Sequence, residues 1–330
     1  MTRLPTFDDV RDAAARLASS LIKTPLLTSQ ELDDRTGGAI FLKAEFLQET
    51  GSFKFRGATN KLRQLTKSEQ TAGVVAWSTG NHAQGVAAAA KALNISAKIV
   101  MPADAPKAKL DGTRAYGAEI VFYDRETDDR EEIGRRIANE ESRVVVPPYD
   151  DFDIICGQGT AGLEMADQIV ESEKILDDVL VPASGGGLLA GVSLAAHKRF
   201  PESQIYVVEP KGFDDHHRSL GNDQCVVNSK RAGSICDALL APTPGKLTWQ
   251  INSKHLAGGY AVCDDDVMDA ISFAHRVFGI RLEPGGAITL AALLNASHDA
   301  KGRTVALVLS GGNVDDDTFN QALARLSANP

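Results

Sequence analysis

Short apolar runs alternate with helix-forming stretches along this 330-residue chain, and that alternation restricts its fold more than any other feature. Eight runs have the length and composition of buried strands, namely AIFLKAEF, GVVAWS, AKIVMP, AEIVFY, VVVPPY, DVLVPAS, IYVVEP and TVALVLS. Strands separated by helices form a mainly parallel sheet that is covered on both faces. We therefore predict an α/β fold with ligands at the carboxyl ends of the strands.

The length of the chain suits one large domain or two interlocked ones. No proline-rich or glycine–serine linker divides the sequence. We expect a small inserted domain over residues 50–144, while residues 1–49 and 145–330 form the large domain. Strands of the small domain are expected around Val75, Ile99 and Val121. The active-site cleft would then lie between two open α/β lobes.

Charge and cysteine content narrow the class of function. The formal net charge is -9 and no basic stripe is visible, so we expect no nucleic-acid partner. The N-terminal segment MTRLPTFDDVRDAAARLA lacks a long apolar core, which predicts neither a secretory signal nor a membrane anchor. The four cysteines form no C-x-x-C pair and fit a reducing compartment: Cys156, Cys225, Cys236 and Cys263. These features favour a cytoplasmic protein that acts on small molecules.

The first candidate motif is GSFKFRG, which follows the predicted strand near Leu42 and opens a helix that runs through Leu62. A lysine at a helix N-terminus is disfavoured by the positive end of the helix dipole. A lysine that loses its charge by desolvation becomes a nucleophile that can form an imine with an aldehyde. Lys54 is therefore a candidate reactive amine, although the motif alone also fits a solvated lysine.

The second motif is the turn STGNH, from Ser78 to His82, between a predicted strand and an alanine-rich helix. Hydroxyls, a glycine and free N–H groups at a helix N-terminus can bind a carboxylate or a phosphate. Simple helix capping explains the same residues. His82 alone fits a structural histidine better than a catalytic base.

The third motif is Ser184-Gly185-Gly186-Gly187-Leu188, which we call the glycine loop, between a strand and a helix. Three consecutive glycines cost chain entropy and expose several backbone donors, which favours a phosphate cradle over a plain tight turn. The loop is not a Walker motif, because no G-K-[ST] follows.

The fourth motif is SGGN, which starts at Ser310 directly after the predicted strand TVALVLS. A hydroxyl at the end of a strand, beside glycines, could contact one ring atom of a cofactor. A turn before the acidic helix start at Asp315 to Asp317 explains it equally well.

One further segment, GQGTAG from Gly157 to Gly162, matches the dinucleotide pattern G-x-G-x-x-G. Its context fails, because Asp177 and Asp178 precede a strand where a nucleotide fold needs an acidic residue at a strand's end. We expect a glycine-rich helix start that packs closely on its neighbours.

Together, GSFKFRG, STGNHAQG, SGGGLLAG, EPGGA and LSGGN occur in the order and at the spacing of one family. The chain resembles the fold-type II pyridoxal-phosphate enzymes, in particular their threonine/serine dehydratase and serine racemase branch. The likeness runs from about residue 10 to about residue 320.

The resemblance implies a cofactor site and a reaction. Lys54 would form the imine with pyridoxal 5'-phosphate and later take the α-proton of the substrate. Hydroxide would then leave as water, protonated by the cofactor phosphate, and the released aminoacrylate would react with water to give a 2-oxo acid and ammonia. The implied cofactor residues are Ser52, Phe53, Lys54, Asn81, Ser184, Gly185, Gly186, Gly187, Leu188 and Ser310. The implied substrate-carboxylate residues are Ser78, Thr79, Gly80 and His82.

The resemblance also implies a divalent-cation site formed by Glu209, Asp215 and the carbonyl of Phe213. Two carboxylates and a carbonyl oxygen suit magnesium, calcium or manganese. A solvated acidic loop is the alternative explanation. We expect His216 and His217 to lie outside the site, as exposed loop residues.

Departures from the family pattern leave the substrate open. Ser184 replaces the first glycine of the usual four, and Ala238 replaces a pocket glycine. Thr79 replaces the serine that reprotonates the substrate in racemases, and its retained hydroxyl makes it the second candidate catalytic residue after Lys54. The leading hypothesis is a threonine or serine dehydratase, with 3-hydroxyaspartate dehydratase and serine racemase as alternatives. A cysteine-forming enzyme and a cofactor-binding protein without catalysis fit less well.

The resemblance carries two further expectations about the whole protein. The chain stops at Pro330, which leaves no room for a regulatory domain, so we expect no feedback control by isoleucine. Homodimers are common among such enzymes, so a homodimer is the expected assembly.

Overall fold

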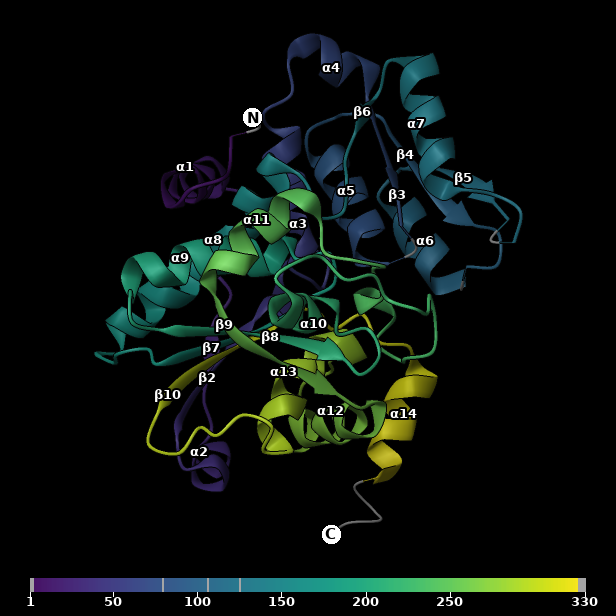
Figure 1. Cartoon of the computed structure of the whole chain (residues 1–330). Helices are drawn as coiled ribbons and strands as arrows, with labels where there is room; N and C mark the ends of the chain where they lie inside the picture. The colour runs from purple at the N-terminus through teal and green to yellow at the C-terminus, as the bar shows by residue number, and fades with distance from the viewer. Residues whose placement is uncertain (1–2, 79, 106, 125, 326–330) are drawn as a thin grey trace.

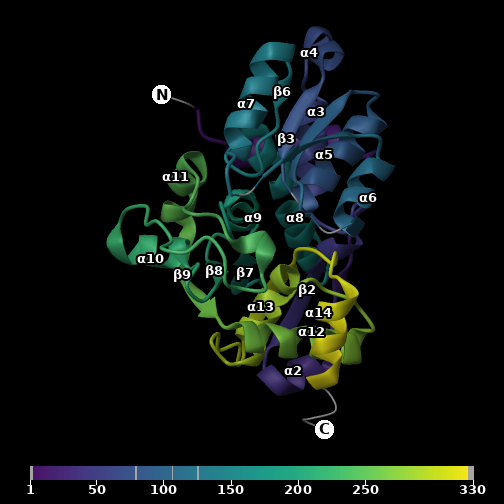
Figure 2. The same cartoon turned by 90° about the vertical axis from the view of Figure 1, so that its right-hand side faces the viewer.

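The computed structural model describes residues 3–325 except 79, 106 and 125. Within this part the strands form two sheets, one of six strands and one of four. Figure 1 shows the smaller sheet with its helices at the top and the larger sheet below, and Figure 2 shows the same division from the side.

The large sheet has the strand order β1-β2-β10-β7-β8-β9. Its strands are β1 (Leu26–Leu27), β2 (Ala39–Ala44), β7 (Asp178–Pro182), β8 (Gln204–Pro210), β9 (Leu256–Val262) and β10 (Thr304–Leu309). All neighbours are parallel except the short edge pair β1 and β2. The central strands are almost continuously apolar because helices cover both of their faces.

Two groups of helices bury the large sheet. Met165 and Ile169 of α8 (Phe152–Glu171) and Leu189 and Val192 of α9 (Gly187–Arg199) pack on one face. The other face is covered mainly by α13 (Pro284–Leu294), which is buried along almost its whole length. Outside α13 lie α2 (Gln30–Thr36), α12 (Asp264–Phe278) and α14 (Asp316–Ala324).

The small sheet has the order β5-β4-β3-β6 and is parallel throughout. Its strands are β3 (Val74–Trp77), β4 (Ala97–Pro102), β5 (Glu119–Tyr123) and β6 (Val144–Val145). One face packs on α3 (Lys54–Leu62) and α5 (Asn81–Ala92), and the other packs on α7 (Arg130–Glu141). The remaining helices are α1 (Phe7–Leu17), α4 (Lys67–Ala72), α6 (Lys107–Ala115), α10 (Asp215–Asn222) and α11 (Lys246–His255), with short 3-10 turns at Glu45–Leu47 and Asp237–Leu239.

Each of the eight apolar runs contains a strand, so the predicted α/β class is confirmed. Two strands were not predicted, the two-residue β1 and the edge strand β9. β9 lies at the end of the sheet, is mostly half-buried and includes Gly258 and Gly259, so it lacks a long apolar run.

The glycines of GQGTAG lie inside α8, because that helix already begins at Phe152, so the expected position at a helix start was wrong. Their predicted role in close packing is confirmed. A Cβ on Gly157 would come within 2.6 Å of the Gly57 Cα in α3, and one on Gly159 within 2.9 Å of the Gly191 carbonyl oxygen in α9. These glycines let the helices of both sheets approach each other closely.

The division into residues 50–144 and the flanking large domain stays a prediction. The strands expected around Val75, Ile99 and Val121 are β3, β4 and β5 of the small sheet. The last strand of that sheet, β6, ends at Val145.

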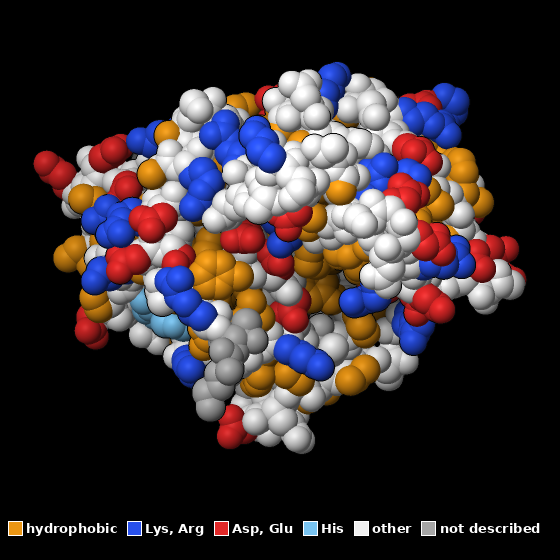
Figure 3. All heavy atoms as spheres, turned by 90° about the horizontal axis from the view of Figure 1, so that it is seen from above, with side chains coloured by type: hydrophobic (Ala, Val, Ile, Leu, Met, Phe, Trp, Pro, Cys, Tyr) orange, Lys and Arg blue, Asp and Glu red, His pale blue; other side chains and the backbone are white. Residues whose placement is uncertain are grey.

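The surface charges and the helices can be compared with the expectation of no nucleic-acid or membrane partner. On the face that Figure 3 shows, Lys and Arg side chains are interspersed with Asp and Glu, which is not the pattern of a basic nucleic-acid groove. In the described part of the chain, no helix combines the length and the apolar character that crossing a membrane requires.

Candidate active site

Three of the predicted motifs converge where the two sheets meet. The Phe53 N–H donates to the Ser310 carbonyl at 3.1 Å, and Ser52 forms an isolated bridge with Gly311. Asn313 donates to the side-chain oxygen of Asn81 at 2.7 Å. The start of α3, the start of α5 and the end of β10 therefore form one site.

Lys54 is the first residue of α3 and is only partly exposed. Its Nζ donates to the Pro148 carbonyl at 2.8 Å and lies 5.1 Å from the centre of the Phe53 ring. Loss of solvation lowers the pKa of Lys54 to about 8, against a weaker opposing effect of Glu283. About a tenth of this amine is thus uncharged at pH 7, far more than of an ordinary lysine, and the uncharged form is the one that acts as a nucleophile or a base.

His82 lies in the first turn of α5 and is buried. Its Nε2 is 2.9 Å from the Val146 carbonyl, which can only accept, so Nε2 carries the hydrogen. Burial and the nearby Lys54 lower the pKa of His82 to about 3. The imidazole is therefore neutral and holds the backbone beside β6, as the structural interpretation of this residue predicted.

Ser78 and Gly80 form the turn before α5. The Gly80 N–H donates to the Ser78 hydroxyl at 3.2 Å, which closes the turn. Thr79, predicted to contact the substrate, lies outside the described residues. The roles predicted for this turn in substrate binding stay predictions.

A buried carboxylate that the sequence interpretation missed lies behind Asn81. Glu283 accepts from the side-chain amide of Asn81 at 2.6 Å, and both residues are less than a tenth exposed. Burial raises the pKa of Glu283 to about 7, partly offset by the Asn81 hydrogen bond. The sequence does contain one signal for this residue. Glu283 of EPGGA directly precedes a long apolar helix, where a buried carboxylate is costly unless it has a hydrogen-bonding partner.

The glycine loop connects β7 to α9, as predicted. Thr248 donates to the Gly185 carbonyl at 2.6 Å and Asn252 donates to the Gly186 carbonyl at 3.3 Å, so α11 holds the loop from one side. Among the described residues, no protein oxygen accepts from the amide N–H groups of Gly185 to Leu188. Four free donors at a helix N-terminus fit a phosphate group.

Two conformational details support this cradle. Gly186 has a φ of 90°, a backbone conformation that residues with a Cβ rarely adopt. The Ser184 hydroxyl accepts from the Ala241 N–H at 2.9 Å, so it braces the loop toward the segment before α11. Ser184 can therefore replace a glycine without closing the cradle.

Ser310 lies at the carboxyl end of β10 and is 4% exposed. Its hydroxyl donates to the Gly285 carbonyl at 3.3 Å, a long contact that leaves the oxygen free to accept. Ser52, on the neighbouring bridge, is buried with a hydroxyl that has no partner among the described residues. Both hydroxyls fit the ring of a heteroaromatic cofactor.

The predicted cation site, which we call the acidic site, is formed by Glu209 in β8 and Asp215 at the start of α10. Glu209 and Asp215 are fully buried, and one ligand atom from each lies within 4.8 Å of the other. One oxygen of Asp215 has no hydrogen-bond partner among the described residues and lies 3.7 Å from His216 Nδ1. Burial together with Glu209 raises the pKa of Asp215 to about 7. Two buried carboxylates with a free oxygen fit a divalent cation.

The expected exposure of His216 was wrong. It is fully buried in the first turn of α10, and its Nδ1 lies 3.2 Å from a Glu209 oxygen. His217 is exposed, as expected, although its N–H donates to Glu209. The side chain of Phe213 is buried, and the predicted contact of its carbonyl with a cation stays a prediction.

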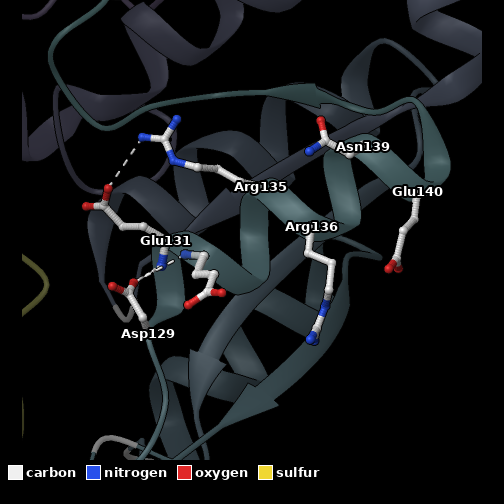
Figure 4. A pocket seen from close by; sticks show the side chains of 7 residues that line it. Asp129, Glu131, Arg135, Arg136, Asn139 and Glu140 are labelled. Carbon is white, nitrogen blue, oxygen red and sulfur yellow. Dashed lines mark hydrogen bonds and ion pairs between the residues drawn. The ribbon is translucent and has the colours of Figure 1, made fainter.

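A shallow hollow elsewhere lies along α7 (Figure 4). It is lined by Asp129, Glu131, Glu132, Arg135, Arg136, Asn139 and Glu140. Arg135 pairs with Glu131 at 3.6 Å, and Asp129 caps the helix. These are the ordinary charges of one exposed helix face, so we assign no site there.

Comparison with known proteins decides the family. A family model described as "Pyridoxal-phosphate dependent enzyme" matches residues 17–311. The chain belongs to this family. Its members depend on the cofactor that the glycine loop and Lys54 fit, so this chain is a pyridoxal-phosphate-dependent enzyme of fold type II.

Three members of the family illustrate the similarity. An L-threo-3-hydroxyaspartate ammonia-lyase of Pseudomonas sp is 40% identical, over 97% of this chain and 99% of the relative. The crystal structure of a threonine deaminase from T.th. has a TM-score of 0.89 and 39% identity, over 94% of this chain and 99% of that one. A maize serine racemase has a TM-score of 0.90 and 35% identity, over 99% of each chain. The predicted branch of the family is thereby confirmed.

Proposed function

We propose that this chain is a hydroxy-amino-acid ammonia-lyase, which eliminates water from a β-hydroxy amino acid and yields a 2-oxo acid and ammonia. The observation that carries the proposal is Lys54, an amine whose pKa is lowered to about 8 and whose Nζ bonds the Pro148 carbonyl. The next residue, Tyr149, packs against Gly185 of the glycine loop, whose N–H donors are free. The names of the relatives support the same reaction class.

We propose that the cofactor residues are those that the motifs predicted: Phe53, Lys54, Asn81, Ser184, Gly185, Gly186, Gly187, Leu188 and Ser310. Pyridoxal phosphate, when bound, supplies an electron sink for the α-carbon of the substrate. Asn81 is held between Glu283 and Asn313, so its orientation is fixed before any ligand arrives. Ser310 offers a neutral hydroxyl, which favours elimination over transamination.

Lys54 moves the proton in this proposal. Its uncharged amine takes the α-proton at Nζ, and the Pro148 carbonyl gives Nζ a fixed position while it is free. His82 cannot compete as a base, because its pKa is about 3 and its Nε2–H faces the Val146 carbonyl. The substrate carboxylate would bind at Ser78, Thr79, Gly80 and the N–H of His82.

The substrate is a hydroxy amino acid, and three candidates follow from the relatives. Two relatives, at 40% and 39% identity, are named L-threo-3-hydroxyaspartate ammonia-lyase, which adds 3-hydroxyaspartate to serine and threonine as a favoured substrate. Serine racemases at 37% and 38% identity keep racemisation as the second candidate.

An ammonia-release assay over stereoisomers of serine, threonine and 3-hydroxyaspartate, with and without a chelator, tests the proposal. We expect ammonia and a 2-oxo acid in equal amounts from at least one substrate. Chiral analysis of the recovered amino acid separates racemisation from elimination. A yellow protein that releases ammonia from none of them would instead favour a cofactor-binding protein without catalysis.

We further propose a magnesium, calcium or manganese ion at Glu209, Asp215 and the Phe213 carbonyl.

We also propose that the protein is a cytoplasmic homodimer, because homodimers are common among such enzymes. Size-exclusion chromatography with light scattering measures the assembly, and a monomer at micromolar concentration would contradict that part.

A further inference from the structure

His216 lies between the acidic site and the glycine loop. Its backbone N–H and its ring Nδ1 both face one oxygen of Glu209, at 3.0 Å and 3.2 Å, while the N–H of His217 meets the other oxygen at 3.0 Å. The first turn of α10 thus grips the Glu209 carboxylate with three donors. Any movement of that carboxylate is transmitted to the His216 ring.

The opposite side of the ring contacts the glycine loop. His216 Nε2 is 3.3 Å from the side-chain nitrogen of Asn252, and that nitrogen is 3.3 Å from the Gly186 carbonyl. Asn252 is fully buried. A Cβ on Gly186 would lie 2.5 Å from His216 Nε2 and 2.6 Å from the Asn252 nitrogen, so both side chains press directly on the loop.

Hydrogen-bond roles along this path are fixed by chemistry. The Gly186 carbonyl can only accept, so the atom of Asn252 that faces it must be the nitrogen. That nitrogen can only donate, so His216 Nε2 must accept and the ring hydrogen must lie on Nδ1. Nδ1 then donates to Glu209. The result is one continuous path from Glu209 through His216 and Asn252 to Gly186.

The same assignment separates His216 from the cation ligands. Its Nδ1 faces the carboxylates but carries the hydrogen, and the lone pair on Nε2 is directed at Asn252. The imidazole therefore orients a ligand carboxylate rather than binding the ion itself, a role that such partners have in many metal sites.

We propose that His216 and Asn252 couple the cation site to the phosphate cradle, so that cation binding and pyridoxal phosphate binding strengthen each other. A cation that fixes Glu209 fixes the His216 ring, and through Asn252 it fixes the Gly186 carbonyl. The loop is then held in the conformation that presents its N–H donors. The inference rests on the proposed cation site and the proposed phosphate cradle.

Binding alone tests the coupling, without any measurement of activity. Calcium affinity of the apoprotein is measured by calorimetry with and without saturating pyridoxal phosphate, and cofactor affinity is measured by absorbance with and without calcium. We expect an increase of about fivefold or more in each direction. The two factors must be equal, because coupling between two binding equilibria is reciprocal.

Two variants interrupt the path at different places. Asn252→Leu and His216→Gln should each bring the coupling factor close to one, while calcium still binds the apoprotein. The matched control is His217→Gln, which changes the adjacent exposed imidazole and should keep the wild-type factor. Thermal unfolding of each variant shows that it is folded; if one is not, the other carries the test.

Each outcome has one meaning. Cofactor and calcium that bind the wild-type protein independently, or a full coupling factor in both folded path variants, overturn the inference and leave the proposed function untouched. Wild-type protein that binds no calcium also overturns it. Failure of the proposed function looks different, since the protein would then bind no pyridoxal phosphate at Lys54 or release no ammonia.

Discussion

At the scale of single residues, the environment of Lys54 gives a pH dependence. Its pKa is lowered to about 8, so about half of the amine is free at pH 8, against well under about 1% for an ordinary lysine. The rate at which the apoprotein forms its covalent link with pyridoxal phosphate should therefore rise with pH and level off above about pH 8. Stopped-flow absorbance measures this rate. A midpoint near 10 would show that the lysine is solvated.

Gly186 gives a second prediction at this scale. Gly186→Ala places a methyl group against His216 and Asn252 and strains a backbone with φ 90°. We expect a loss of cofactor affinity of about tenfold or more in an equilibrium titration. Gly221→Ala is the matched control, because Gly221 is exposed in α10 with open space around it, and it should bind the cofactor as the wild type does. Equal cofactor affinities for the two variants would show that the glycine loop does not bind the cofactor.

At the scale of elements, a buried ionic network fixes α3 and hence Lys54. Arg56, two residues beyond Lys54, bonds Glu45 at 2.7 Å and Glu164 at 2.8 Å, and Lys43 bonds Glu164 at 2.9 Å. Glu45, Lys43 and Arg56 are fully buried. The network ties α3 to β2, to the 3-10 turn after it and to α8.

Removing the central cation should therefore be costly. Arg56→Leu leaves the Glu45 carboxylate buried without the cation that it bonds, with the Thr24 hydroxyl as its remaining donor, and we expect a loss of about 3–5 kcal/mol in the free energy of unfolding. Urea denaturation measures it. The comparison is Arg276→Ala, which breaks an exposed pair with Glu31 and should cost much less. A similar small loss for both variants would show that the network does not hold α3.

Local patterns were sufficient for eight of the described strands and for the turns after them. The eight apolar runs predicted strands because burial on both faces requires continuous apolar sequence, and Lys54 and the glycine loop were visible because each breaks an ordinary rule at a helix start. β9 was missed because an edge strand needs no such run.

Residues whose role depends on contacts between distant parts of the chain could not be predicted from the sequence. Glu283 reaches Asn81 across 202 positions, and Asn252 reaches Gly186 across 66. His216 was misjudged because its sequence neighbours are charged and polar, while its burial comes from β8 and α11. No local spacing records such contacts, so these residues appear only once the chain is folded.

At the scale of the whole molecule, the site exists only because the two sheets are joined. Lys54 and the turn before α5 belong with the small sheet, while the glycine loop and Ser310 end strands of the large one. The close glycine contacts of α8 with α3 and α9 hold these parts together. The central claim is therefore that one amine and one phosphate cradle, from different sheets, bind a single cofactor.

Reduction with borohydride tests that claim most directly. Purified protein is incubated with pyridoxal phosphate, reduced, digested and examined by mass spectrometry, with Lys54→Ala treated in parallel. We predict a stable pyridoxyl group on Lys54, on no other lysine, and none on the variant. A label on a different lysine, or an unlabelled Lys54 after saturation with cofactor, would contradict the account.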